Sequence, residues 1–255
     1  MSMLPVPLDT SVVAAAGALS YHAAMDADCI AGNIAEVSER VRAAAEKVGR
    51  APETVQVLAV SKTHPAEAVR AAFAAGLRHF GENYLQEAED KIAATADLDG
   101  IHWHFIGPIQ SNKTRAIAAH FDWVHSVDRL KIARRLSEQR PENRPPLKVC
   151  LQVNISGEAS KSGVEPAALP ALAAAVAELP RLELRGLMAI PAPFADEAKK
   201  REPFARLAAL LATLGETLPG LDTLSMGMSA DLEAAIAEGA TLVRIGTAIF
   251  GPRGT

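Results

Sequence analysis

The sequence has 255 residues, with 26 Lys and Arg against 30 Asp and Glu, and a formal net charge of -4. This mildly acidic balance argues against a general nucleic-acid binder, because affinity for nucleic acid depends mainly on a net positive surface. With 49% hydrophobic and 22% charged residues, the composition is that of a globular protein and excludes a mainly disordered chain.

Residues 1–30 are expected to form an N-terminal extension of irregular structure, in which Pro5 and Pro7 disfavour a regular start. Its short apolar stretch, 12–19, has no Lys or Arg before it, so no secretory signal is predicted. No apolar run approaches the ~20 residues needed to cross a bilayer. Cys29 and Cys150 are far apart and form no CxxC motif, which argues against a disulfide framework. A cytoplasmic protein without membrane contact is expected.

The first regular element is an amphipathic helix over 33–48. Its apolar residues recur at helical spacing, and Gly49 is expected to end it. These residues are Ile34, Val37, Val41, Ala44 and Val48.

Eight β-rich runs then alternate with Ala-rich helical stretches. The predicted strands are 55–60, 79–84, 102–106, 123–127, 148–155, 184–190, 223–226 and 242–245. The helical stretches include 65–75, 112–120, 166–179, 199–214 and 230–238. This alternation predicts an α/β fold of parallel strands, and the count of eight favours a closed TIM-like (β/α)8 barrel as a single domain over 31–255. The alternative is an open Rossmann-like sheet, which is weakened because no GxGxxG follows a strand.

The helix at 33–48 precedes the first strand, and little follows the last one. It is therefore expected to occupy the outer-ring place of the helix that normally follows strand eight. Active sites of such barrels lie at the carboxyl ends of the strands, often with a phosphate site in the loops after strands seven and eight.

Lys62 follows the first predicted strand, and period-two alternation puts it on the same face as Leu58 and Val60. If Val60 faces the barrel interior, Lys62 lies at the rim. A partly desolvated lysine at a barrel mouth can form a Schiff base with an aldehyde. The alternative is an ordinary strand-end lysine that extends into solvent.

The loops after strands seven and eight have the features of a phosphate site. Met228 and Ser229 follow strand seven, and Ser229 is expected to cap the helix at 230–238. Gly246 and Thr247 follow strand eight, where a glycine lets backbone N–H groups approach a ligand. Alternatively, these glycines only serve tight strand-to-helix turns.

Arg244 shares the face of Gly246, and a buried guanidinium there needs a partner. A ligand ring acceptor or a nearby carboxylate could both serve. Asn83, at the end of strand two, could donate a hydrogen bond to the same ligand or be a turn residue. His102 and His104 stand two apart on one strand, but a metal site is not expected because partner ligands are not visible nearby.

Five segments together resemble the pyridoxal phosphate homeostasis protein family (YggS/PROSC type). They are Val-Ser-Lys-Thr at 60–63, His-Phe-Gly-Glu-Asn-Tyr at 79–84, the pair 103–107 and 110–113, Gly-Leu-Met-Ala-Ile at 186–190, and the pair 225–229 and 243–251. The resemblance runs in unbroken order from about residue 33 to the end. It implies a fold type III barrel, like the N-terminal domain of alanine racemase, that holds pyridoxal 5′-phosphate (PLP).

Residue by residue, the resemblance implies a Schiff base on Lys62 and Arg244 against the pyridine nitrogen. Ser229, Gly246 and Thr247 would hold the phosphate, with Met228 in the same loop. Asn83 would line the pocket. Met188 and His104 also match family motifs, but chemistry assigns them no role.

Racemisation through PLP needs a base on each face of the ring, and Lys62 supplies one. In alanine racemase the second is a tyrosine from a separate C-terminal domain of the partner subunit, whereas this sequence ends after strand eight and contains only Tyr21 and Tyr84. Arg244 stays protonated, which weakens the electron sink that carbanion chemistry needs. These points favour a protein that holds PLP without catalysis, and the resemblance implies that its role is in vitamin B6 homeostasis.

Two other functions stay open: a fold type III enzyme of low activity, such as an amino-acid racemase or decarboxylase, and a Schiff-base aldolase acting on a sugar phosphate. Apo forms of PLP-dependent enzymes are the expected recipients of the cofactor. The sequence shows no obvious dimerisation domain, so a monomer is expected.

Overall fold

The structure is a computed structural model that describes residues 10–157, 162–192 and 196–252. For residues 10–26 and 197–198 only the backbone is described.

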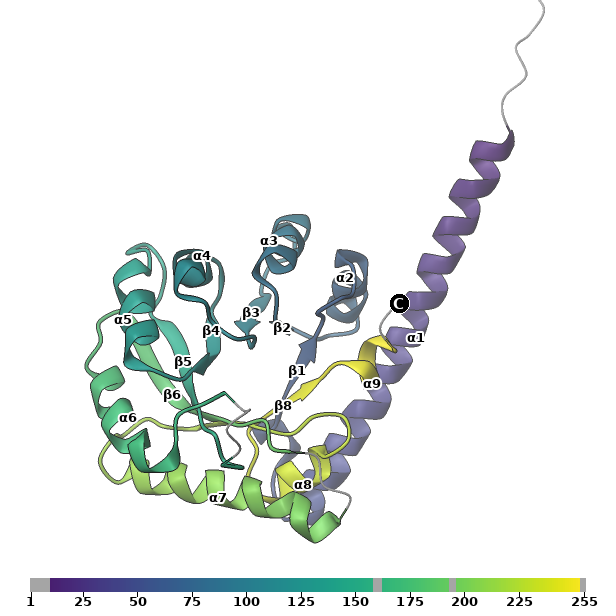
Figure 1. Ribbon diagram of the computed structural model, residues 1–255. Helices are drawn as coiled ribbons and strands as arrows, with labels where there is room; N and C mark the ends of the chain where they lie inside the picture. The colour runs from purple at the N-terminus through teal and green to yellow at the C-terminus, as the bar shows by residue number, and fades with distance from the viewer. Residues whose placement is uncertain (1–9, 158–161, 193–195, 253–255) are drawn as a thin grey trace, which may run out of the picture.

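Eight parallel strands form a closed barrel in chain order, with β1 paired to β8 (Figure 1). The strands are β1 (Gln56–Val60), β2 (His79–Glu82), β3 (His102–Phe105), β4 (Trp123–Val127), β5 (Leu147–Gln152), β6 (Leu182–Met188), β7 (Thr223–Ser225) and β8 (Leu242–Ile245). The predicted (β/α)8 barrel is confirmed. The strands are bounded as predicted to within a few residues, and β4 and β8 match completely.

The connecting helices lie outside the barrel (Figure 1). They are α2 (Ala66–Ala74), α3 (Leu85–Ala94), α4 (Thr114–His120), α5 (Leu130–Gln139), α6 (Leu169–Ala177), α7 (Glu197–Gly215), α8 (Leu232–Ala237) and α9 (Thr247–Phe250). Short 3-10 helices precede β1, α4 and α6, at Pro52–Thr54, Ser111–Lys113 and Pro166–Ala168. Over the described ranges, none of the helices is long and apolar enough to serve as a membrane span.

Helix α1 (Thr10–Lys47) packs against α2, α8 and α9, which is the predicted place in the outer ring. It begins at Thr10, so residues 10–30 are helical where an irregular extension was expected; residues 1–9 lie outside the described residues. Alanine, the best helix former, is frequent between 14 and 35, and no proline follows Pro7 in this segment. These propensities let the helix extend upstream of its packed half.

The packed half of α1 presents a stripe of buried apolar side chains at helical spacing. They are Ile30, Ile34, Val37, Val41, Ala44 and Ala45. Val48 was predicted to join this stripe but is 40% exposed, because the helix ends at Lys47 and Gly49 turns the chain with a φ of 70°.

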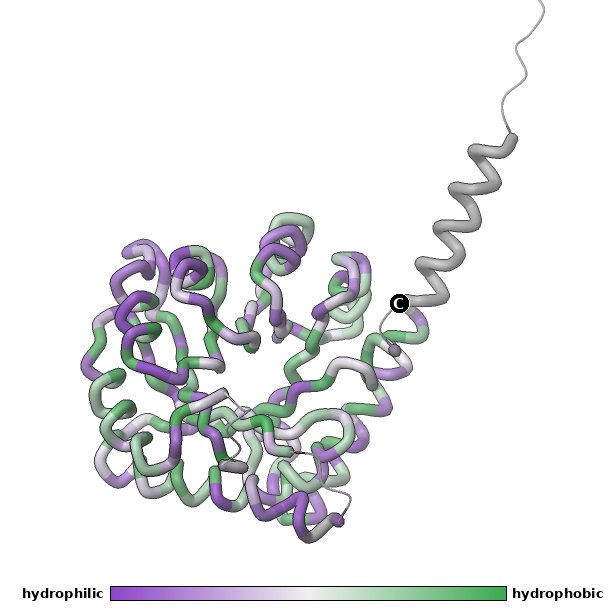
Figure 2. The backbone as a smooth tube through the Cα atoms, in the orientation of Figure 1, coloured by the Kyte–Doolittle hydropathy of each residue, from purple (hydrophilic) through white to green (hydrophobic). Residues whose placement is uncertain are grey.

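The core has two parts, an apolar layer between strands and helices and a more polar barrel interior. Hydrophobic residues mark the strands, while hydrophilic and hydrophobic residues alternate along the outer helices (Figure 2). The strands approach closely where a glycine permits it: a Cβ on Gly186 would lie 1.9 Å from the carbonyl oxygen of Thr223. Inside the barrel, His104, His125, Ser225 and Arg244 are buried.

Candidate functional site

A cavity of about 260 Å³ opens at the carboxyl ends of the strands, between the turn after β1, the end of β2 and the loops after β7 and β8. It is lined by Val60, Lys62, Asn83, Ile106, Ile190, Met228, Ser229, Ala230, Arg244, Gly246 and Thr247. All seven residues that the sequence pattern predicts for the cofactor site are in this set. The fold therefore brings them to one place.

Lys62 is the second residue of a tight turn that follows β1. The amide of His64 donates to the carbonyl of Ser61 at 3.1 Å and closes this turn. Thr63, the third residue, has a φ of 65°, a left-handed conformation that costs a β-branched residue about 1–3 kcal/mol. Lys62 is half-buried and lines the cavity together with Val60, as the alternation predicts.

Arg244 in β8 is 4% exposed and donates to three neutral acceptors. Nη1 donates to the carbonyl and hydroxyl oxygens of Ser225, at 2.6 and 2.9 Å, and Nη2 donates to the carbonyl of Ala189 at 2.9 Å. Burial lowers the pKa of Arg244 to about 10, so the side chain stays charged at neutral pH. Its acceptors among the described residues are all neutral, and Asp231 acts on it only by Coulombic attraction, so the alternative of a salt bridge to a nearby carboxylate is not supported there.

A chain of hydrogen bonds runs from Arg244 through the barrel interior. His125 Nδ1 lies 2.8 Å from Ser225 Oγ, His125 Nε2 lies 2.9 Å from His104 Nδ1, and His104 Nε2 lies 2.9 Å from His79 Nδ1. Arginine can only donate, so Ser225 Oγ accepts from it and its own proton is left for His125 Nδ1. His125 and His104 then each donate from Nε2 to Nδ1 of the next imidazole, and His79, which accepts at Nδ1, carries its proton on Nε2.

The three histidines are neutral because they are buried. Burial lowers the pKa of His79 to about 4 and that of His125 to about 3, and it lowers the pKa of His104 well below its usual value. His79 also lines a second cavity, of about 240 Å³, at the opposite, amino-terminal end of the strands. The row of hydrogen bonds from Arg244 to His79 thus connects the two ends of the barrel interior.

This row of hydrogen-bonded histidines was not predicted from the sequence. The sequence pattern places His102 and His104 on one strand and gives no relation among the other histidines. In the structure His102 stacks on His79, with ring centroids 4.8 Å apart, and is not a member of this row. Three neighbouring strands each contribute one imidazole, and this recurrence of histidine at inward positions was the available signal. In the described parts of the chain, no three His, Cys, Asp or Glu side chains are grouped so as to hold a metal ion.

The loop after β7 differs in one respect from the prediction. Helix α8 begins at Leu232 with Asp231 as its N-cap residue, so Ser229 does not cap it. Asp231 Oδ1 instead accepts from the amide of Met228 at 2.6 Å, and Arg40 of α1 donates to the carbonyl of Ser229 at 2.9 Å. These bonds hold the loop and leave the Ser229 side chain at the cavity.

Two glycines shape the loops for reasons of space. Gly227 has a φ of 90°, and a Cβ there would lie 2.6 Å from the Cβ of Ala235. Gly246 is the N-cap of α9, and a Cβ there would meet the carbonyl oxygen of Val60 at 3.3 Å. The first N–H groups of a helix lack intrahelical acceptors, so the start of α9 presents donors beside Thr247.

Asn83 lines the cavity and follows β2, which lies on the other side of β1 from β8. Its Oδ1 atom is buried and has no hydrogen-bond partner among the described residues. A buried amide oxygen without a partner is unfavourable by about 1–3 kcal/mol, so this atom favours a bound donor.

The chain matches known families and relatives over most of its length. The family model "Alanine racemase, N-terminal domain" matches residues 32–254. The pyridoxal phosphate homeostasis protein of Pseudomonas aeruginosa is 70% identical over 224 residues, which cover 88% of this chain and 96% of the relative. That of Escherichia coli K12 is 58% identical over 226 residues, covering 88% and 97%.

Among solved structures, PipY of Synechococcus elongatus with PLP bound aligns with a TM-score of 0.76 and 41% identity, covering 87% of this chain and 100% of PipY. The family model spans all eight strands and all residues that line the cavity. The chain therefore belongs to the alanine racemase N-terminal domain family and, within it, to the pyridoxal phosphate homeostasis proteins.

Proposed function

We propose that this chain binds PLP covalently through Lys62 Nζ and holds it without catalytic turnover, as a cytoplasmic protein of intracellular PLP homeostasis. The observation that carries the proposal is that seven residues predicted from four separate segments line one cavity. The names of the curated relatives and the PLP bound to PipY support the identity of the ligand. Apo PLP-dependent enzymes are the proposed recipients, and the chain is proposed to act as a monomer.

The donor set of the cavity fits this cofactor. Arg244 is a buried cation whose described partners are neutral, so it can donate further to a ring nitrogen or favour an anion nearby. Asn83 Oδ1 needs a donor. Ser229, Thr247 and the first N–H groups of α9 offer the small donors that a phosphate accepts from.

PLP supplies an aldehyde that condenses reversibly with a primary amine, and a ring that can act as an electron sink. Lys62, which lines the cavity, would supply this amine, and its condensation with the aldehyde would release one water. Arg244 would keep its own proton, because its pKa of about 10 lies far above neutral pH. Arg244 would then donate a hydrogen bond to the ring nitrogen without transferring its proton, and a ring held in this way would be a weaker electron sink.

The absence of turnover is also proposed from the lining of the cavity. Among the described residues that line it, Lys62 and Arg244 are the ones with basic side chains. Proton transfer on both faces of a bound ring needs a second base, and an arginine that stays protonated does not provide one. The lining therefore favours retention of the cofactor over racemisation.

The proposal is tested by treating the purified chain with PLP, reducing it with borohydride and mapping the product by mass spectrometry. We expect one addition of reduced PLP, on the peptide that contains Lys62. Addition spread over exposed lysines, with none on Lys62, would refute covalent binding at this site. In deuterated water, exchange of an amino acid α-hydrogen faster than with free PLP would favour the racemase alternative.

The phosphate loops give a separate prediction. Ser229→Ala and Thr247→Val are expected to weaken PLP binding about tenfold each, because hydrogen bonds to a charged group contribute about 1.5–3 kcal/mol. Binding of pyridoxal, which lacks the phosphate, should stay the same. Affinities from fluorescence titration check both statements. The control is Thr217→Val, in the connection between α7 and β7, which leads to the amino-terminal end of the barrel and not to the cavity. An equal loss of affinity for pyridoxal would contradict the assignment of these loops.

A further inference from the structure

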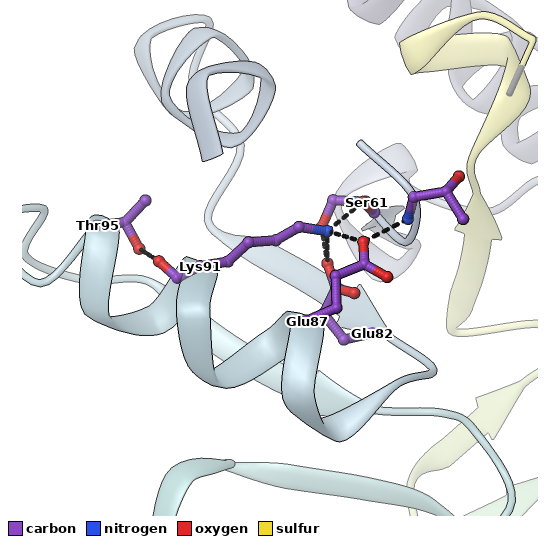
Figure 3. Close-up of polar contacts among 6 residues, drawn as sticks. Ser61, Glu82, Glu87, Lys91 and Thr95 are labelled. Atoms are coloured by element: carbon purple, nitrogen blue, oxygen red, sulfur yellow. Dashed lines mark hydrogen bonds and ion pairs between the residues drawn. The ribbon is translucent and has the colours of Figure 1, made fainter. Parts of the chain in front are cut away.

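A buried group of charged side chains lies directly behind the turn that carries Lys62 (Figure 3). Ser61 Oγ donates to Glu82 Oε1 at 2.6 Å, and Lys91 Nζ lies 2.8 Å from the same carboxylate oxygen. Both charged residues are buried: the side chains of Lys91 and Glu82 are 5% and 0% exposed. None of these three residues lines the proposed cofactor cavity.

Lys91 Nζ is linked to the residues before and after Lys62, to Ser61 directly and to Thr63 through Glu87. It donates directly to the carbonyl of Ser61 at 2.6 Å, on the N-terminal side of Lys62. It also donates to Glu87 Oε1 at 2.6 Å, and the same oxygen accepts from the amide of Thr63, on the C-terminal side. A single ammonium group thus fixes the residues before and after Lys62.

The turn needs such support because Thr63 is held in the left-handed region. A β-branched residue leaves that conformation unless the surrounding structure imposes it. The bond from the Thr63 amide to Glu87 provides this restraint, and Glu87 is held in turn by Lys91, four residues later on α3. Without it, relaxation of Thr63 would change the direction of the Lys62 side chain.

The ion pair is not explained by stability alone. Burial raises the pKa of Glu82, and its Oε2 atom is buried without a hydrogen-bond partner in the described structure. Apolar side chains of similar volume often stabilise a core as well as a buried ion pair does. A role in positioning accounts for charged groups at this place.

We infer that Lys91 is a positioning residue for Lys62: with Glu82 and Glu87, it holds the turn at Ser61–Thr63 in the conformation that directs the Lys62 amine into the cavity. The inference rests on the proposed function, because it concerns the lysine proposed to bind PLP. In this view, formation of the covalent bond to PLP depends on the turn, whereas recognition of the phosphate and the ring depends on the loops after β7 and β8.

The test compares PLP with pyridoxine 5′-phosphate, which has the same ring and phosphate but no aldehyde. In Lys91→Met we expect about tenfold weaker binding of PLP and unchanged binding of pyridoxine 5′-phosphate, because misplacement of a reacting group by about 1 Å is enough for such a loss. Glu87→Ala, a milder change at a partly exposed residue, should give a smaller loss of the same kind. Arg42→Met, which breaks the exposed i,i+4 ion pair with Glu46, is the matched control.

Each outcome is decisive. Equal losses for both ligands in Lys91→Met and Glu87→Ala would mean that the group only stabilises the fold, and no loss for either ligand would mean that it does not position Lys62. If Lys91→Met does not fold, Glu87→Ala decides between the same outcomes. Failure of the unmodified chain to bind either ligand would instead refute the proposed function.

Discussion

Lys62→Ala is expected to abolish covalent attachment of PLP. No other amine lines the cavity among the described residues, so borohydride reduction should leave no PLP on the protein in this region. The visible absorbance of the bound cofactor should disappear as well. Part of the affinity should survive, because the phosphate and ring contacts proposed for Ser229, Thr247 and Arg244 do not involve the amine.

The measurement is a visible spectrum of the variant with PLP, followed by mass analysis after reduction and by titration with pyridoxine 5′-phosphate. Lys131→Ala, at an exposed position of α5, is the control and should behave as the unmodified chain. An unchanged spectrum in Lys62→Ala would remove Lys62 from the proposal. Loss of pyridoxine 5′-phosphate binding together with the spectrum would show that Lys62 supports the cavity itself.

The barrel was predictable because its evidence is local. Each strand is a short β-rich run and each helix an Ala-rich stretch, so alternation alone gives the order of elements, and the count of eight favours closure. The upstream half of α1 could not be predicted in the same way, because Pro5 and Pro7 suggested an irregular start. The helix begins at Thr10, and the many alanines from Ala14 onward favour helix in this segment.

The cavity was predictable for a related reason. In a barrel all carboxyl ends of the strands meet at one mouth, so residues such as Lys62, Asn83 and Ser229 converge once their strands are placed. The hydrogen-bond partners of the buried polar side chains could not be predicted from the sequence. The bonds of Arg244 to Ser225 join residues 19 apart in the chain and depend on the register between β7 and β8. The bond from Lys91 to Ser61 joins residues 30 apart and depends on how helix α3 lies against the turn after β1.

Acid is expected to destabilise the fold through the buried histidines. An unfolded histidine takes up a proton near pH 6.5, whereas His125 in the fold does so only near pH 3 and His79 near pH 4. Between these values the unfolded chain binds more protons than the folded one, so stability falls as the pH is lowered from about 7 to 4. His125 alone should reduce the free energy of unfolding by about 2 kcal/mol between pH 7.5 and pH 5.

Urea unfolding at pH 7.5, 6.5 and 5 measures this slope. In His125→Asn the slope should be smaller, although the variant is less stable at pH 7.5 because it breaks the hydrogen-bond chain. Thr217→Val, in the turn after α7, changes no titratable group, should leave the slope unchanged and is the control. A pH-independent stability of the unmodified chain, or the same slope in His125→Asn, would contradict neutral histidines in the barrel.

Protonation of His125 in the folded protein, which takes place only near pH 3, should affect the cofactor cavity. A protonated His125 turns Nδ1 from an acceptor into a donor, and Ser225 Oγ, which already accepts from Arg244, then loses the acceptor of its own proton. Arg244 would lose the alignment that this serine provides. Between pH 7.5 and 5 the folded protein keeps His125 neutral, so the pH dependence of PLP affinity, measured by fluorescence titration, should be the same in the unmodified chain and in His125→Asn. Only as the pH approaches 3 should the unmodified chain lose more affinity than the variant, whose side chain at this position does not titrate; a difference already at pH 6 would contradict this assignment.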